Sequence, residues 1–190
     1  MNETVEIRWH GRGGQGTVTA AKVFADACLS SGRYVQAFPE YGPERAGAPV
    51  QAYNRISEKK LRKHCPVLQP DIVIVADFTL LDGIDVSAGT YERSAFLINA
   101  GNIEAIKKML RLESGQKTYV VDGTRIALGT IGRPMPNSPL VGALAKISGL
   151  VEVDIVADDV ARSFDKKFPL KIVDGNRNAV KRGWEEVREI

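Results

Sequence analysis

The fold is decided by residues 5–38, which read VEIRWHGRGGQGTVTAAKVFADACLSSGRYVQAF. Polar and apolar residues alternate over residues 5–9, as they do in a strand with one buried face. A glycine cluster follows, and apolar residues then recur every three or four positions from Thr17 to Ser30, which predicts a helix. Gly32 ends that helix, and residues 34–38 are typical of a second strand. The segment therefore predicts a strand, a glycine loop, a helix and a strand.

The rest of the chain continues this alternation. Further strands are predicted at residues 50–56, 71–76, 94–99 and 118–121, and helices at residues 103–112, 123–131, 140–147, 158–168 and 170–187. We predict one domain over residues 1–190, with a helical C-terminal part at about 151–190. Its expected fold class is α/β, a three-layer α/β/α arrangement with a mostly parallel, mixed sheet and a Rossmann-like glycine loop after the first strand.

Composition excludes several classes of protein. Of 190 residues, 44% are hydrophobic and 26% charged, as in an ordinary globular domain. Lys and Arg number 26 against 23 Asp and Glu, and a net charge of +3 does not favour nucleic acid as a partner. The only charge block, residues 59–64, is interpreted as a solvated turn or helix face. The sequence shows no signal peptide and no membrane-spanning run, so we expect a cytoplasmic protein without membrane contact.

The scarce residues argue against a metal centre. Cys28 and Cys65 are the only cysteines, and His10 and His64 the only histidines. They form no CxxC motif and show no metal-ligand spacing, and two cysteines cannot hold a four-cysteine cluster. We therefore expect no metal site on this chain, and we interpret His10 as a structural hydrogen-bonding residue.

The glycine cluster at residues 11–16 matches G-x-G-x-x-G between a strand and a helix. Glycines let backbone N–H groups converge on an anion, and the N-terminus of the helix adds a favourable dipole. Arg12 offers phosphate a pair of parallel donors. A tight turn that packs against a neighbouring chain is the alternative. The candidate ligand-binding residues are Gly11, Arg12, Gly13, Gly14, Gln15 and Gly16.

A second loop, residues 39–49 (PEYGPERAGAP), is long and rich in Gly and Pro, which is typical of functional loops. It should lie at the same sheet edge as the glycine loop, because both follow the carboxyl ends of strands. Arg45 is a candidate for pairing with a phosphate or carboxylate, or alternatively with Glu44 or Glu40. Glu40 also lies 24 residues after Gly16, near the place of the ribose-binding acid in dinucleotide-binding folds.

Residues 10–27 (HGRGGQGTVTAAKVFADA) and 36–57 (QAFPEYGPERAGAPVQAYNRIS) together resemble the gamma subunit of 2-oxoacid:ferredoxin oxidoreductases, pyruvate type. The resemblance covers essentially the whole chain, including DIVIVAD at residues 71–77 and DGTRIA at 122–127. The Gly-Ala-Pro ending at residues 47–49 favours the pyruvate or branched-chain types over the 2-oxoglutarate type.

The resemblance implies a non-autonomous subunit of an enzyme that turns pyruvate, coenzyme A and oxidised ferredoxin into acetyl-CoA, CO2 and reduced ferredoxin. It implies partner alpha, beta and delta subunits that hold thiamine diphosphate, Mg and iron–sulfur clusters. This chain would then bind no cofactor firmly, carry no catalytic residue and be inactive alone. It would assist assembly and coenzyme A access, with residues 11–16 and Arg45 as the candidate site.

Three alternatives remain open at this point. They are a gamma subunit of a branched-chain 2-oxoacid:ferredoxin oxidoreductase, a stand-alone NAD-type nucleotide-binding domain, and a scaffolding module anchored by Phe38 and Tyr41. Four polar residues near predicted strand ends or helix starts are interpreted as caps and turn formers rather than as catalysts. These are Asp77, Asn99, Asp122 and Asn137.

Overall fold

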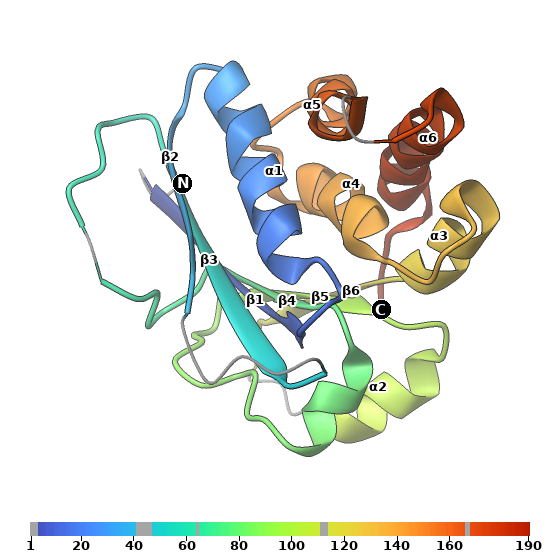
Figure 1. Cartoon of the computed structure of the whole chain (residues 1–190). Helices are drawn as coiled ribbons and strands as arrows, with labels where there is room; N and C mark the ends of the chain where they lie inside the picture. Colours follow the sequence, from blue (N-terminus) through green and yellow to red (C-terminus); the bar gives the residue numbers. More distant parts are fainter. Residues whose placement is uncertain (1–3, 41–46, 64, 111–113, 166–167) are drawn as a thin grey trace.

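The computed structural model describes residues 4–40, 47–63, 65–110, 114–165 and 168–190, and there it contains a seven-stranded sheet (Figure 1). The strand order is β2-β3-β1-β4-β5-β6-β7. Strands β1, β4, β5 and β6 pair in parallel, whereas β3 and β7 run antiparallel to their neighbours. The predicted mostly parallel, mixed sheet is confirmed. The strands are β1 (Thr4–Arg12), β2 (Tyr34–Pro39), β3 (Pro49–Ser57), β4 (Ile72–Val75), β5 (Ala95–Asn99), β6 (Lys117–Val121) and β7 (Arg188–Glu189).

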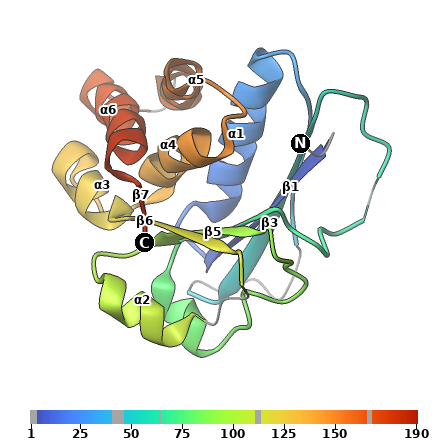
Figure 2. The ribbon, with the colours of Figure 1, turned by 180° about the vertical axis from the view of Figure 1, so that it is seen from behind.

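Helices cover both faces of the sheet, which confirms the predicted three layers (Figures 1 and 2). Among the described residues the two helical layers are unequal, because one face carries five helices and the other carries α2 with a short 3-10 helix, η1. No helix in the described part of the chain is both long and apolar enough to cross a membrane. The larger layer is α1 (Thr17–Ser30), α3 (Gly123–Ile131), α4 (Asn137–Ser148), α5 (Val153–Asp165) and α6 (Leu170–Glu186); the smaller is α2 (Ile103–Met109) and η1 (Phe78–Asp82).

Each face of the sheet has its own hydrophobic core. Along β4, Ile72 and Ile74 point into the larger core beneath α1 and α4, and Val73 and Val75 point into the smaller core against α2 and η1. Burial on both faces explains why this strand is a continuous apolar run.

Helices α4 and α6 cross at very short range. A Cβ atom added to Gly183 of α6 would lie 2.0 Å from the carbonyl oxygen of Pro139 in α4. One added to Gly142 of α4 would lie 1.9 Å from the carbonyl oxygen of Val180 in α6. The two helix backbones therefore approach each other through a pair of glycines.

Element boundaries differ from the prediction mainly near the C-terminus. Helix α4 begins at Asn137 rather than at residue 140, because Pro139 is accommodated in its first turn. Helix α5 begins at Val153 rather than at residue 158. The two-residue β7 and the short η1 were not predicted. The predicted cap of α2 is confirmed, since the Asn102 side chain accepts from two backbone N–H groups of its first turn.

Candidate functional site

The glycine loop (residues 11–16) and the described end of the second loop meet beyond the carboxyl end of β1. The backbone N–H of Gly13 donates to the carbonyl oxygen of Ala48 at 2.8 Å, and the N–H of Gly47 donates to that of Gly13 at 3.1 Å. The prediction that both loops share one sheet edge therefore holds for these residues. Arg45 and Tyr41 lie outside the described residues.

Arg12 joins three segments at this edge. Its Nε donates to Oδ2 of Asp77 at 3.0 Å, its Nη1 to the carbonyl oxygen of Gly47 at 3.2 Å, and its Nη2 to Oγ1 of Thr79 at 2.8 Å. Three of the five guanidinium donors are thus engaged within the chain. The prediction of Arg12 as a phosphate fork missed this role, in which Arg12 fastens the second loop and η1 to the glycine loop.

Gln15 and Asp77 complete the same network. The Gln15 side chain accepts from the backbone N–H of Arg12 at 3.0 Å and donates to Oδ2 of Asp77 at 2.9 Å. Burial by itself would raise the pKa of Asp77, but hydrogen bonds from Thr79 and Gln15 and the charge of Arg12 outweigh it and lower that pKa. Asp77 is therefore ionised and neutralises much of the charge on Arg12. Asp77 follows β4 at the sheet edge that also carries the glycine loop, and this position is the sequence signal that could have revealed its role in the network.

The N-terminus of α1 keeps free hydrogen-bond donors. Its N-cap, Gly16, has a φ of 77° and no side-chain capping bond, and no acidic residue lies in the first turn. The backbone N–H groups of Thr17, Val18 and Thr19 have no acceptor among the described residues, as expected for an uncapped first turn. Gly14, with a φ of 91°, is exposed beside them. This arrangement of N–H groups and helix dipole attracts an anion.

Two buried polar side chains adjoin this turn. The hydroxyl of Thr17 has no hydrogen-bond partner in the described chain, and a Cβ atom on Gly11 would lie only 2.0 Å from it. Asn137 is 8% exposed and packs against Gly16, with its Nδ2 3.1 Å from the place a Cβ atom of Gly16 would take. The N-cap of α4 is Pro136, so the interpretation of Asn137 as a cap was wrong.

The other polar residues singled out at strand ends have structural roles. Asp77 caps η1 and Asp122 caps α3. The Asn99 side chain donates to the carbonyl oxygen of Ala76 and to the hydroxyl of Thr124. The interpretation of Asp77 and Asp122 as caps is confirmed, whereas Asn99 ends strand β5 and links it to Ala76 and to the first turn of α3.

Glu40 does not stand where a ribose-binding acid would. Strand β3 lies between β1 and β2, so the strand before Glu40 is not the neighbour of the strand before the glycine loop. The Glu40 carboxylate accepts a hydrogen bond from the hydroxyl of Tyr53 on β3. Of the two features that supported a stand-alone NAD-type domain, the glycine motif and Glu40, the second is thereby lost.

His10 is structural, as predicted. It lies in β1 and is buried, and its Nε2 accepts a hydrogen bond from Nε of Arg8 at 3.1 Å. Burial, with a smaller contribution from the charge of Arg8, lowers the pKa of His10 to about 4. The imidazole is neutral at pH 7, and no three metal-ligating side chains gather within the described ranges.

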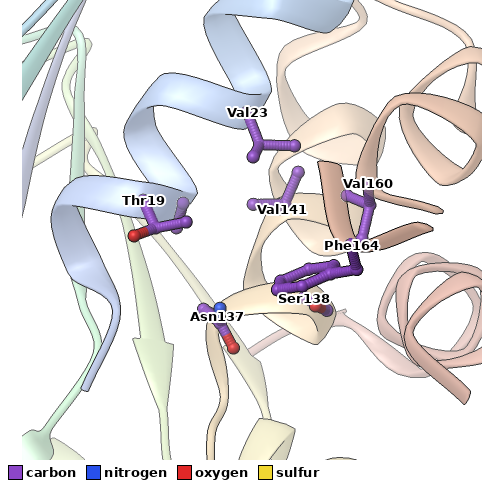
Figure 3. Close-up of a pocket in the computed structure, with 8 residues that line it drawn as sticks. Thr19, Val23, Asn137, Ser138, Val141, Val160 and Phe164 are labelled. Carbon is purple, nitrogen blue, oxygen red and sulfur yellow. The ribbon is translucent and has the colours of Figure 1, made fainter. Parts of the chain in front are cut away.

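A small pocket opens between α1, α4 and α5 (Figure 3). Its space of about 10 Å³ has room for a single water molecule, which excludes it as a nucleotide site. A phosphate at the first turn of α1 would therefore not lie inside this pocket. The lining residues are Thr19, Ala20, Val23, Asn137, Ser138, Val141, Val160 and Phe164.

Comparison with known proteins agrees with this architecture. The family model for pyruvate ferredoxin/flavodoxin oxidoreductase matches residues 6–186. The chain belongs to this family. It is 44% identical to the pyruvate synthase subunit PorC of Thermotoga maritima over 184 residues, covering 96% of this chain and 94% of that protein. The crystal structure of a Thermotoga maritima pyruvate oxidoreductase subunit PORC superimposes with a TM-score of 0.86 at 40% identity, covering 99% of both chains.

A further relative is named for two oxidoreductases. The Pyrococcus abyssi protein named pyruvate/ketoisovalerate oxidoreductases common subunit gamma is 42% identical over 186 residues, and the match covers 97% of each chain. Family membership makes this chain an enzyme subunit of the gamma type, as the sequence predicted.

Proposed function

We propose that this chain is the gamma subunit of a pyruvate:ferredoxin oxidoreductase and that it binds phosphate groups of coenzyme A at the N-terminus of α1. The complex converts pyruvate, coenzyme A and oxidised ferredoxin into acetyl-CoA, CO2 and reduced ferredoxin. Alpha, beta and delta subunits hold thiamine diphosphate, Mg and the iron–sulfur clusters. This chain contributes no catalytic residue, and the assembled enzyme works in the cytoplasm.

The observation that carries the coenzyme A site is the uncapped first turn of α1. Its free N–H groups, the exposed glycine at position 14 and the absence of acid in that turn suit an anion. The orphaned hydroxyl of Thr17 fits the same role. Coenzyme A offers a diphosphate and a 3′-phosphate to such donors. Arg12 acts mainly by holding the two loops together, and Arg45 is a second candidate cation.

Thr19 gives a sharp test, because it is exposed in the first turn of α1. Thr19→Glu and Thr19→Gln differ only in charge, and an acid at this position is favourable for the helix itself. We expect Thr19→Glu to raise the KM for coenzyme A about tenfold, which corresponds to about 1.4 kcal/mol. Thr19→Gln should leave it within twofold. Equal KM values for both variants in an assembled complex would rule out a phosphate site here.

Arg12→Ala and Arg45→Ala complete this set. Each should raise the apparent KM for coenzyme A in the complex. An unchanged KM, with failure of assembly as the sole defect, would mean that the loops serve packing alone.

A second substrate is supported by the Pyrococcus abyssi relative, whose name covers two oxidoreductases. We propose that this chain also joins a branched-chain 2-oxoacid enzyme. Purification of the tagged chain from its source should then recover coenzyme A-dependent dye reduction with pyruvate and with 2-oxoisovalerate. Activity with pyruvate alone would restrict the chain to one enzyme.

A further inference from the structure

Residues 58–63 (EKKLRK), here called the basic loop, concentrate the charge of the molecule. Four cations and Glu58 give this loop a net charge of +3, which equals the net charge of the whole chain. All other residues together therefore sum to zero. The basic loop thus combines four cations with one acid over six consecutive residues.

The cations of the basic loop face solvent. Lys60, Arg62 and Lys63 are exposed and make no ion pair with any described residue, while Glu58 pairs with Arg33 at 3.6 Å. In both ribbon views, the teal segment that follows β3 stands out from the body of the molecule (Figures 1 and 2). Three uncompensated cations are thus presented at a projecting point.

A buried arginine fixes this loop to the sheet. Arg55 on β3 is 1% exposed, and its Nε donates to Oε1 of Glu6 at 2.6 Å. Its Nη2 donates to the carbonyl oxygen of Cys65 at 2.5 Å, just beyond the basic loop. Gln36 on β2 donates to the carbonyl oxygen of Lys63 at 2.9 Å. The loop has no regular secondary structure, but side chains from two strands hold its far end.

This arrangement has an energetic cost that needs an explanation. Burying a guanidinium is costly even when it is paired, and like charges held on a fixed backbone repel one another. The repulsion among the loop cations is offset if the loop meets an anionic partner, and a loop held in place by Arg55 loses less entropy on binding. Lysine is depleted from the cores of protein interfaces, whereas charges at the exposed rim of an interface accelerate the encounter of the partners.

The basic loop is remote from the proposed coenzyme A site. At one end of β1, Arg12 pairs with Pro49; at the other end, Thr4 pairs with Ser57, directly before the basic loop. The length of β1 therefore separates the basic loop from the glycine loop, so the two surfaces can be tested independently.

We propose that the basic loop is a docking site for the acidic face of the electron-carrier protein that accepts electrons from the complex. The family is described as a ferredoxin/flavodoxin oxidoreductase, so its reaction requires a carrier protein that binds and leaves in each cycle. The identity of this carrier protein rests on the proposed function. Its interface is small and electrostatic, and it controls the rate of encounter.

The test uses the purified complex with Lys60→Gln, Arg62→Gln and Lys63→Gln combined in this subunit. Pyruvate- and coenzyme A-dependent reduction is measured with the host's ferredoxin and with methyl viologen, across a range of ionic strength. We expect the KM for ferredoxin to rise about tenfold at low salt, with the difference shrinking as salt screens the charges. The kcat and the viologen rate should remain unchanged.

A matched control removes three exposed cations elsewhere, as Lys108→Gln, Arg133→Gln and Lys171→Gln. None of them makes an ion pair in the described chain. The control should leave the KM for ferredoxin within twofold. If the KM for ferredoxin rises equally in the control, the effect comes from the net charge of the subunit. If the KM is unchanged in the test variant, the loop is only a solvated turn. Failure of assembly would make it a permanent subunit contact. Each result would overturn the proposal, whereas loss of pyruvate-dependent viologen reduction in the unaltered complex would instead refute the proposed function.

Discussion

The crossing of α4 and α6 gives a prediction in which one substitution has opposite effects at two glycines. Gly183→Ala places a methyl group 2.0 Å from a backbone carbonyl oxygen of α4. Gly129→Ala, on α3, places it 3.4 Å from Nη1 of Arg182, the flexible end of a long side chain. Both positions are helical, so both variants gain the same helix propensity.

The size of the effect follows from those distances. A carbon atom needs more than about 3 Å from a carbonyl oxygen, and the oxygen belongs to a helix backbone that cannot rotate away. Overpacking of this kind costs about 1–3 kcal/mol, and the upper end applies when backbone must move. Helix propensity returns about 1 kcal/mol. Gly183→Ala should therefore lower the free energy of unfolding by about 2 kcal/mol, and Gly129→Ala should raise it by up to about 1 kcal/mol.

Urea titration of the purified chain, followed by far-UV circular dichroism, measures both changes, and thermal unfolding provides a second measure. For a chain of this size, about 2 kcal/mol lowers the Tm by about 4–8 °C. Two variants that shift stability in the same direction would refute the reasoning, as would a Gly183→Ala protein as stable as the parent. Gly142→Ala, which meets the same crossing from α4, should reproduce the loss.

Three further predictions concern ionisable groups. Burial lowers the pKa of His10 to about 4 in the folded chain, so between pH 6.5 and pH 4 the unfolded chain binds more protons than the folded chain. The contribution of His10 to the free energy of unfolding is therefore complete above pH 6.5, and about 3 kcal/mol is lost as the pH falls to 4. Acid titration of the parent protein and of His10→Gln would reveal this difference. Asp77→Asn should lower the free energy of unfolding by about 1 kcal/mol at pH 7. The pKa of Asp77 is lowered in the folded chain, so its carboxyl contributes stability only while it is ionised. In urea unfolding, the difference between the variant and the parent should therefore vanish in acid. Exposed Cys65 should react with N-ethylmaleimide in the native protein, whereas Cys28, whose pKa burial raises to about 12, should react only after unfolding; labelling of both thiols in native protein, seen by mass spectrometry, would contradict the structure.

Local periodicity predicted the elements that stabilise themselves locally. The helix from Thr17 to Ser30 was predicted with both ends, because its apolar stripe and the glycines on either side lie within one segment. The cap of α2 by Asn102 could be predicted equally well, because a capping hydrogen bond spans only two or three residues. By contrast, the two-residue β7 exists only because Glu189 pairs with Tyr119 of β6, a partner 70 residues away in the sequence.

Only part of the candidate site could be predicted from the sequence, because the rest depends on contacts between distant segments. The glycine motif reveals where a chain can turn and present N–H groups, and those groups are at the first turn of α1 as expected. The motif does not reveal which strand lies beside it. Strand β3 occupies the place next to β1, so the loop keeps the means of binding an anion but lacks the neighbouring acid that selects a ribose.

Tertiary structure likewise decides how much of the charge of Arg12 remains available to an anion. Because Asp77 compensates that charge, the attraction left for an anion comes mainly from backbone N–H groups and the helix dipole, which no side-chain substitution removes. Arg12→Lys keeps the charge but cannot reach Asp77, Gly47 and Thr79 together with a single ammonium group. If Arg12 acts by holding the loops, the lysine variant should raise the KM for coenzyme A nearly as much as Arg12→Ala does. Full activity of Arg12→Lys would instead show that the positive charge alone matters.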